Sequence, residues 1–453
     1  MSQAPEPAIS LAAQLVAELF ATRGDHLLVG GISVADLAAE FGTPLFVYDA
    51  ALMRVAYRQL RGAVEGFAQV YFSAKANPNP AILRVFVTEG AGLEIASGAE
   101  YLRAQAAGCR PQRILFAGPG KRDAELTLVL REGIGEIHLE SYEEIDRIDK
   151  LASALQRRAP VGLRVNPLAS AQGGAMQMGG RAAQFGFDEE TIESVVDAVM
   201  ARPSLELLGV HLFAGTQILD ANVLAAQWRH GLIVARRIAE RIGKPLATID
   251  LGGGLGIPYF GGDRTLLLNV LTTHVASLAG MVCHDSLLRG ASIIIEPGRY
   301  LVGPAGVYVA RVHSAKTSRG TRFIVTDGGM HHHLAASGNL GQFIKRDYPI
   351  VAADRMDSTE TANSVVVGPL CTPLDTIGRE ASLPQLKPGN LVALLQSGAY
   401  ALTASPNGFL SHPMPAEILV DSGQARIIRE PGSFAAPLSQ LPLDPSAIAC
   451  VRS

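Results

Sequence analysis

The stretch VYFSAKANPNP, from Val70 to Pro80, carries one lysine at the end of a strand-like run. Apolar residues precede Lys75, and the proline-rich segment behind it ends the strand pattern before a helical run, AILRVFVTE, begins. A lone lysine at such a place usually extends its ammonium group to solvent. A parallel-sheet enzyme, in contrast, uses the same place for a catalytic group. The rest of the chain decides between these two interpretations.

Eight strand-like runs alternate with helical stretches between residues 68 and 299. They are AQVYFSAK (68–75), GLEIAS (92–97), RILFAGP (113–119), EIHLES (136–141), PVGLRVNP (160–167), LELLGVHLFAG (205–215), TIDLGGG (248–254) and SIIIEPG (292–298). This alternation predicts a closed parallel (β/α)8 barrel, the TIM-barrel architecture. An open doubly wound sheet is the alternative, and the count of eight favours the barrel.

The pattern changes after Arg299 to strand-like runs divided by Gly, Pro and Asn, with little helix between them. These runs are GVYVARVHSAKT (306–317), TRFIVTDGG (321–329), NSVVVGPLC (363–371), NLVALLQSG (390–398) and AEILVDSGQARIIRE (416–430). They predict a C-terminal antiparallel β domain, a β-sandwich or Greek-key barrel. Near the N-terminus, LAAQLVAELFA (11–21) predicts an amphipathic helix, and residues 27–50 look like strands that would join the β domain. The predicted domains are therefore 1–44, an N-terminal helix and strands contributing to the β domain; 45–299, the barrel; and 300–453, the β domain.

Length, composition and charge exclude several classes of protein. The chain has 453 residues, too many for one ordinary core, with 48% hydrophobic and 18% charged residues. The net charge is -3 and no basic stripe occurs, which argues against nucleic acid or an anionic membrane as a partner. Four dispersed cysteines without a CxxC pair predict neither a metal site nor a disulfide framework. Without a basic signal-peptide region or a long uncharged apolar run, the predicted location is the cytoplasm.

Unusual polar and glycine residues collect at the ends of the predicted strands, where barrel enzymes place catalytic groups and often bind phosphate. They are Lys75, His211, Phe213, Gly215, Thr216, Gly252, Gly253, Gly254, Glu296 and Arg299. Three glycines alone could form a tight turn, and His211 is interpreted as a core residue. Together, however, a lysine, a glycine loop, an arginine and a buried glutamate are the groups that hold pyridoxal 5'-phosphate. The lysine forms a Schiff base, the glutamate keeps the pyridine nitrogen protonated, and the loop and arginine take the phosphate.

At these motifs the chain resembles the fold-type III pyridoxal-phosphate decarboxylases, which include the diaminopimelate and ornithine decarboxylases. The likeness extends from about Gly42 to Leu419 and rests on YFSAKAN, GVHLFAGTQ, DLGGGLGI, EPGRYLVGPAG, GPLCTPLD and SGAYALT. It implies an alanine-racemase-like barrel plus a β domain, and a head-to-tail homodimer. The implied function is α-decarboxylation of an amino acid.

The resemblance also implies a role for each matching residue. Lys75 matches the Schiff-base lysine, and Cys371 matches the cysteine that reaches the active site from the partner subunit and protonates the carbanion. The matches to cofactor-binding residues are Gly252 to Gly254 and Thr216 near the phosphate, Glu296 at the pyridine nitrogen, Arg299 at the phosphate or substrate, and Tyr400 closing over the phosphate. Thr372 and Asp375, in the same motif as Cys371, are expected to contact the substrate together with Arg299.

The departures from the family pattern concern the cofactor ring and the distal end of the substrate. Phe213 stands where the relatives have a histidine that stacks on the ring; an aromatic face can still stack but cannot share a proton. Thr372 stands where the relatives have an acid, and Ala335 lies near the place of an arginine that binds a distal carboxylate. Arg181 could compensate for that arginine. The neighbouring His331, His332 and His333 could suggest a metal site, but neighbours along a chain rarely converge on one ion.

The sequence motifs MHHHLAASGN, GPLCTPLD and MQMGG…QFG resemble those of a smaller branch of the family. This branch includes the glutamyl-[acyl-carrier-protein] decarboxylase and the exosortase-associated decarboxylases. That branch implies a substrate whose side chain is masked or tethered to a carrier. The alternatives are a diaminopimelate decarboxylase of lysine biosynthesis, an amino-acid racemase, and a non-catalytic regulatory relative. A racemase would need a second acid/base, normally a tyrosine, and a non-catalytic relative would be expected to lose the lysine or the glycines.

Overall fold

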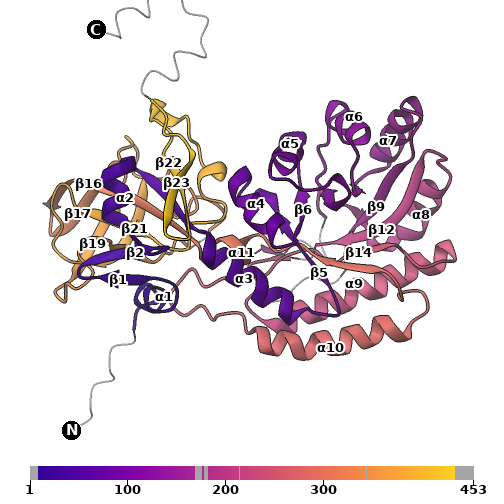
Figure 1. The fold of residues 1–453 in the computed structure, drawn as a ribbon, viewed down its shortest axis with the longest axis horizontal. Helices are drawn as coiled ribbons and strands as arrows, with labels where there is room; N and C mark the ends of the chain where they lie inside the picture. The colour runs from indigo at the N-terminus through magenta and orange to yellow at the C-terminus, as the bar shows by residue number, and fades with distance from the viewer. Residues whose placement is uncertain (1–8, 169–175, 178–181, 214, 343, 434–453) are drawn as a thin grey trace, which may run out of the picture. The chain divides into compact units, whose positions relative to one another are not determined.

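The computed structural model describes residues 9–168, 176–177, 182–213, 215–342 and 344–433. The chain divides into two compact units. One consists of residues 53–258 and 264–302, and the other of residues 1–52, 259–263 and 303–453. Each unit is described by itself below (Figure 1).

The first unit is a closed parallel barrel. Its strands are β5 (Gln69–Ser73), β6 (Gly92–Ile95), β7 (Ile114–Phe116), β8 (Glu136–Leu139), β9 (Ala159–Asn166), β12 (Leu205–Leu212), β14 (Thr248–Asp250) and β15 (Ser292–Ile295). Each strand pairs in parallel with the next, β15 pairs with β5, and β8 pairs with β9, so no edge remains open. All eight predicted strands are confirmed, and the open-sheet alternative is wrong.

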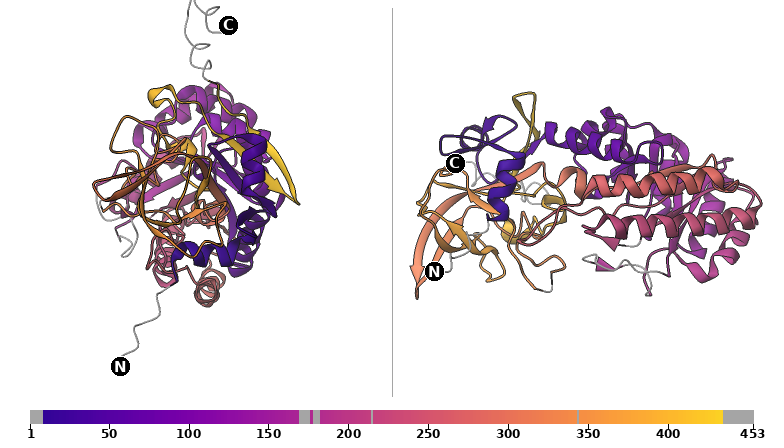
Figure 2. Two further views of the ribbon diagram at one scale, coloured as in Figure 1. Left: turned by 90° about the vertical axis from the view of Figure 1, so that its left-hand side faces the viewer. Right: turned by 90° about the horizontal axis from the view of Figure 1, so that it is seen from below.

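Helices follow the strands and surround the barrel (Figure 1). They are α3 (Ala50–Ala63), α4 (Pro80–Thr88), α5 (Gly98–Ala106), α6 (Asp123–Glu132), α7 (Tyr142–Ala154), α8 (Ile192–Met200), α9 (Ala221–Ile242), α10 (Leu268–His284) and α11 (Arg299–Val302). Several begin where a polar side chain caps the first turn: Ser97 accepts from the N–H of Glu100, and Ser141 from that of Glu144. The long helices α9 and α10 lie side by side (Figure 2). The alternation of strands and helices thus follows from two features of the sequence: apolar residues that form buried strands, and polar residues that cap the first turns of the helices.

The second unit is the predicted β domain. Its elements are α1 (Leu11–Leu19), β1 (Ala21–Arg23), β2 (His26–Val29), β3 (Ile32–Ser33), α2 (Val34–Phe41), β4 (Leu45–Asp49), β16 (Gly306–Ser318), β17 (Thr321–Thr326), β18 (Ile350–Ala352), β19 (Ala362–Val367), β20 (Thr376–Leu383), β21 (Leu391–Leu394), β22 (Ala416–Asp421) and β23 (Gln424–Arg429). Most neighbouring strands are antiparallel, as predicted. Two pairs, β17 with β19 and β4 with β22, are parallel.

Two details near the N-terminus concern the segment expected to form strands. Residues 34–41, expected as strand, form α2, because Ser33 caps the helix by accepting from Ala35 N–H and because Val34, Leu37 and Ala38 place one buried face at helical spacing. Strand β4, within the residues 27–50 expected to join the β domain, pairs with β16 and β22 of that domain. All five of its side chains are buried, as befits a central strand.

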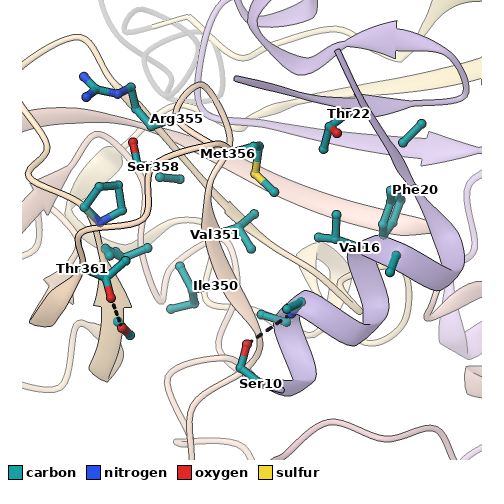
Figure 3. Close-up of a pocket in the computed structure, with 18 residues that line it drawn as sticks. Ser10, Val16, Phe20, Thr22, Ile350, Val351, Arg355, Met356, Ser358 and Thr361 are labelled. Carbon is teal, nitrogen blue, oxygen red and sulfur yellow. Dashed lines mark hydrogen bonds between the residues drawn. The ribbon is translucent and has the colours of Figure 1, made fainter. Parts of the chain in front are cut away.

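A groove of about 600 Å³ lies beside α1 in the β domain (Figure 3). Its lining combines apolar side chains, among them Val16, Phe20, Ile350, Val351 and Met356, with serine and threonine hydroxyls and the charged Arg355. None of the site residues predicted from the sequence lines this groove. It is therefore separate from the chemistry that the motifs predict.

Within the described part of the chain, no helix combines the length and the apolar character needed to cross a membrane. The cytoplasmic location expected from the sequence stays a prediction.

Candidate active site

Lys75 lies directly after barrel strand β5, in the short 3-10 helix η1 (Ala74–Ala76). Its Nζ atom lies 3.2 Å from Oε1 of Glu94, at the same end of the neighbouring strand β6. The second oxygen of Glu94 accepts from the Ser73 hydroxyl, so the carboxylate is held from two sides. The Lys75 side chain is 43% exposed while that of Glu94 is 2% exposed. The amine is thus oriented by a buried acid and is still accessible to a ligand.

Phe213 lies close to the same amine. Nζ of Lys75 is 5.7 Å from the centroid of the Phe213 ring, within the range of a cation–π contact. Phe213 follows β12 and is partly buried. The structure therefore brings together the lysine and the aromatic side chain that the sequence predicted to face the cofactor ring.

The glycine loop Gly252–Gly254 follows strand β14. Gly252 and Gly254 have φ angles of +70° and +96°, which favour glycine over any residue with a Cβ. A Cβ on Gly254 would lie 2.6 Å from the Gly215 carbonyl oxygen, and one on Gly253 would collide with the Glu296 carbonyl oxygen. The Glu296 N–H also donates to the Gly252 carbonyl at 2.9 Å. The loop is thus a bare backbone surface joined to the strand end that carries Glu296, as a phosphate cradle requires.

Glu296 follows strand β15 and is 4% exposed. Its Oε2 atom lies 3.4 Å from Nε2 of His211, on β12. Burial alone would raise the pKa of Glu296, but His211 and the neighbouring Asp250 outweigh it and hold that pKa below its usual range. Burial lowers the pKa of His211 to about 4. Glu296 is therefore a buried carboxylate, the charge state that a protonated pyridine nitrogen would pair with.

Arg299 and Thr216 lie at the same end of the barrel strands. Arg299 begins α11, three residues after Glu296, and is partly buried. Thr216 lies in β13 (Gly215–Thr216), which pairs with β10 (Met176–Gln177). The barrel thus gathers a lysine amine, an aromatic ring, a glycine loop, a carboxylate and a guanidinium at the carboxyl ends of its strands. This donor set fits pyridoxal phosphate: an amine for the aldehyde, an acid for the ring nitrogen, and N–H groups and a cation for the phosphate.

Cys371, Thr372 and Asp375 lie together in a loop of the β domain. Cys371 is an exposed free thiol. The Thr372 hydroxyl accepts from the Leu374 N–H at 3.3 Å. Asp375 is 2% exposed, and its two oxygens accept from Met330 N–H at 2.6 Å and Leu370 N–H at 2.8 Å. Since both oxygens are committed to the backbone, Asp375 orders this loop in the structure; a direct contact with substrate stays a prediction.

Tyr400 belongs to the same unit and has a φ angle of +53°. A bulky residue in this left-handed region is uncommon and strained, and such strain often marks a functional position. The role of Tyr400 over the cofactor phosphate stays a prediction.

The histidine run does not converge on one point. His332 contacts the Tyr308 hydroxyl through Nδ1 at 3.2 Å and the Pro413 carbonyl through Nε2 at 3.0 Å. His333 instead contacts the Ser397 hydroxyl through Nε2 at 3.0 Å, while the His331 ring packs against those of His332 and His412. Ala335 is buried. Arg181, the residue that could compensate for it, lies outside the described residues.

Sequence reasoning missed several charged residues inside the barrel. Glu94 and Asp250 are single acids at the ends of apolar strands, and Glu136 and His138 alternate along β8. His138 Nε2 lies 3.4 Å from Glu136 Oε1, and the His138 ring packs 4.5 Å from that of His211. The alternation of Glu136, His138 and Glu140 was an available signal, because residues two apart on a barrel strand face the same side. Through His211, these buried polar side chains adjoin Glu296 of the predicted site.

Ligand-type atoms of four of these buried residues all lie within 4.8 Å of one another. The residues are His138, His211, Asp250 and Glu296. Within the cluster, His211 Nε2 lies 3.4 Å from Glu296 Oε2 and the two imidazole rings pack against each other, while Asp250 accepts from the Gly252 N–H at 2.8 Å. We therefore interpret it as a network of acids and imidazoles.

Comparisons with known proteins agree with this geometry. The chain is 38% identical over 403 residues to the L-glutamyl-[BtrI acyl-carrier protein] decarboxylase of Niallia circulans, covering 88% of this chain and 94% of that protein. It is 32% identical to the diaminopimelate decarboxylase of Zymomonas mobilis subsp. mobilis, covering 91% and 95%. The crystal structure of diaminopimelate decarboxylase from M. jannaschii in complex with L-lysine has the same fold, with a TM-score of 0.86, 24% identity, and coverage of 95% of this chain and 99% of that one.

The family model described as the pyridoxal binding domain of pyridoxal-dependent decarboxylases matches residues 52–303, the segment that forms the barrel and carries Lys75, the glycine loop and Glu296. The cofactor predicted from the sequence is thereby confirmed as pyridoxal phosphate, and the activity as that of a carboxy-lyase. The chain belongs to the pyridoxal-dependent decarboxylases.

Proposed function

We propose that this decarboxylase removes the α-carboxyl group of an amino acid whose side chain carries no free distal charge, such as a glutamyl group tethered to an acyl-carrier protein. The observation that carries the proposal is the neutral side chain of Thr372 and of Ala335, in the segments where the family resemblance implies charged residues for the distal end of the substrate. The Thr372 hydroxyl is engaged by the Leu374 N–H, and Ala335 is a buried methyl group. Neither offers a charge to a free carboxylate or ammonium.

A tethered substrate also agrees with the comparisons. The relative that is 38% identical is named for a glutamyl group on a carrier protein, and its similarity extends over 88% of this chain. The similarity to diaminopimelate decarboxylases is lower, at 32% for the Z. mobilis protein. A free diacid would bring a desolvated carboxylate without a partner, which costs about 1–3 kcal/mol or more. An amide or thioester would bring no such charge.

The residues of the barrel would hold the cofactor as follows. Lys75 would bind its aldehyde end, Glu296 its ring nitrogen, and Phe213 one face of its ring. Gly252, Gly253 and Gly254 would hold the phosphate, joined by Thr216 and Arg299. Tyr400, a residue of the β domain, is the further residue that the family resemblance assigns to the phosphate. When bound, pyridoxal phosphate supplies an electron-accepting ring that stabilises the charge left on the α-carbon as CO2 departs.

Cys371 would complete the reaction as the proton donor. After the bond to the carboxylate breaks, the α-carbon needs one proton, and a thiol can deliver it from Sγ. The Cys371 side chain is exposed to solvent. It lies in a loop that Asp375 holds through hydrogen bonds from two backbone N–H groups. We propose that the loop serves the barrel of a second copy, so that the active unit is a homodimer.

The experiment is a kinetic panel with purified enzyme and added cofactor. CO2 release is measured for carrier-tethered glutamate, a side-chain amide of glutamate, free glutamate, free meso-diaminopimelate and free ornithine. We expect the highest kcat/KM for a substrate with a masked side chain, by roughly tenfold or more over the free diacids and diamines. If free diaminopimelate gave the highest value of the panel, the substrate proposal would be wrong and lysine biosynthesis would become the function.

A further inference from the structure

Two buried acids meet behind the predicted cofactor site. Asp250 ends strand β14 and Glu296 follows the neighbouring strand β15; they are 1% and 4% exposed. Asp250 Oδ1 accepts from the Gly252 N–H at 2.8 Å. Its other oxygen, Oδ2, and Oε1 of Glu296 find no hydrogen-bond donor among the described residues. Ligand-type oxygens of the two carboxyls lie within 4.8 Å of each other.

Two ionised carboxylates cannot share such a place at low cost. Each buried charge must be compensated by a partner, and each buried oxygen without a donor carries a desolvation penalty. A single proton between the two acids satisfies both orphan oxygens, because a protonated carboxyl is a donor and an ionised one is an acceptor. The geometry therefore calls for one neutral acid and one carboxylate.

The surroundings decide which acid keeps the proton. Glu296 faces the His211 ring, with Nε2 3.4 Å from its Oε2, whereas Asp250 faces the Gly252 N–H and Glu296. Burial, followed by the charge of Glu296, raises the pKa of Asp250 well above its usual value. Further ionisable groups near the pair are His138, whose ring packs at a tilt against that of His211, and Glu136, which contacts His138. Another is Tyr71, whose pKa is raised by burial and, to a lesser extent, by Asp250 and Glu136. Glu296 is thus the favoured carboxylate and Asp250 the favoured acid.

We propose that Asp250 is a positioning residue that stays a neutral carboxylic acid at neutral pH and donates its proton to Glu296 while accepting from Gly252. The Asp250 side chain then links Glu296, the residue proposed to bind the ring nitrogen, to the glycine loop proposed to bind the phosphate. The positioning role rests on the proposed function of Glu296 and the glycine loop. The shared proton itself does not, since it follows from the contacts of the apoprotein.

Two variants distinguish a neutral Asp250 that donates to Glu296 from an ionised Asp250. In Asp250→Asn the amide oxygen can still accept from Gly252 and the NH2 group can still donate to Glu296, so the variant copies the neutral acid. Asp250→Val keeps a similar volume but leaves the Gly252 N–H and the Glu296 oxygen unpaired. We expect the cofactor dissociation constant of Asp250→Asn to stay within about threefold of wild type, and that of Asp250→Val to rise roughly tenfold or more. Asp250→Asn weakening the binding as much as Asp250→Val, or failing to fold, would overturn the proposal.

Infrared spectroscopy tests the shared proton without relying on activity or on a foldable Val variant. The holoenzyme at neutral pH should show the C=O stretching band of a protonated carboxyl, shifted in D2O and absent from Asp250→Asn. Absence of that band in the wild type would also overturn the proposal. Failure of the proposed function would look different: no decarboxylation of any amino acid by an enzyme that still shows the band.

Discussion

The Lys75 amine forms an ion pair with Glu94, an acid that is almost fully buried at the end of the adjacent barrel strand. Nζ and Oε1 are 3.2 Å apart, and Ser73 holds the second carboxylate oxygen. An exposed pair would contribute little. Here one partner is anchored in the barrel and the other is the group that we propose to bind the cofactor, so the pair sets the direction of the amine.

Glu94→Gln should therefore impair catalysis. The change removes the negative charge beside Lys75. The amine then loses a charged hydrogen bond, which contributes about 1.5–3 kcal/mol to holding it in place. We expect kcat/KM to fall roughly tenfold or more. The control is Glu193→Gln, which breaks a pair with Arg237 in which the Glu193 side chain is 44% exposed. A decrease no larger than that of the control would show that Glu94 does not orient the amine.

Mixing two inactive variants tests the shared active site. Lys75→Ala lacks the amine and Cys371→Ala lacks the thiol, so a mixed dimer would hold one intact site and one doubly deficient site. With equal amounts and complete exchange of subunits, roughly a quarter of the wild-type activity should return. Exchange is checked by native mass spectrometry with one chain isotopically labelled. Full exchange without recovered activity would show that each site takes both residues from one chain.

Asp375 should matter for the stability of the loop that carries Cys371. In Asp375→Asn one carboxylate oxygen becomes an NH2 group facing a backbone N–H, either that of Met330 or that of Leu370. We expect the free energy of unfolding to fall by about 1–3 kcal/mol, with a matching decrease in melting temperature. The control is Asp357→Asn, at an exposed position of the same unit. Unchanged stability with strongly raised KM would instead assign Asp375 to the substrate.

Acid should destabilise the β domain through its buried histidines. The Ala336 N–H donates to His333 Nδ1 at 3.3 Å, so Nε2 carries the proton that meets the Ser397 hydroxyl. Burial lowers the pKa of His333 from 6.5 to about 3, and a second proton would face a backbone donor. The unfolded chain binds that proton and the folded chain does not, so stability falls as the pH falls from about 6.5 towards 3.

Calorimetry of wild type and His333→Asn across this pH range checks the prediction. One group that stays neutral contributes up to about 1.4 kcal/mol per pH unit, so the variant should show a flatter pH dependence whatever its absolute stability. His313→Asn, at an exposed position on β16, is the control and should keep the wild-type dependence. Equal pH dependences of wild type and His333→Asn would contradict the assignment of His333 as a buried neutral group.

Much of the fold could be predicted because the barrel strands have a simple physical signature. Most are short, largely buried runs followed by Gly, Pro or a polar residue, as in SIII of β15, which is buried after its first residue and precedes Glu-Pro-Gly. Helix α2 escaped prediction because it is only eight residues long and lies between two strand-like runs, so the sequence pattern favours strand over the whole segment. The parallel pairing of β4 with β22 could not be predicted, since it joins segments more than 350 residues apart.

The residues of the candidate site also differ in how well the sequence predicts them. Lys75, the three glycines and Glu296 are placed by the ends of strands, which a sequence can indicate. Glu94 and Asp250 each interrupt an apolar strand once, and one charged residue in such a run does not reveal its neighbours. Only closure of the barrel brings side chains from different strands to one interior, so their contacts become visible in the structure alone.

The most direct test of the proposed site is reductive labelling of the purified holoenzyme. Treatment with borohydride should fix the cofactor covalently to the protein, and peptide mass mapping should place the label on the peptide that contains Lys75 and on no other lysine. Lys75→Ala should bind no label and release no CO2 from any amino acid of the panel. A label on a different lysine, or decarboxylation at wild-type rate by Lys75→Ala, would contradict the assignment of Lys75 as the residue that carries the cofactor.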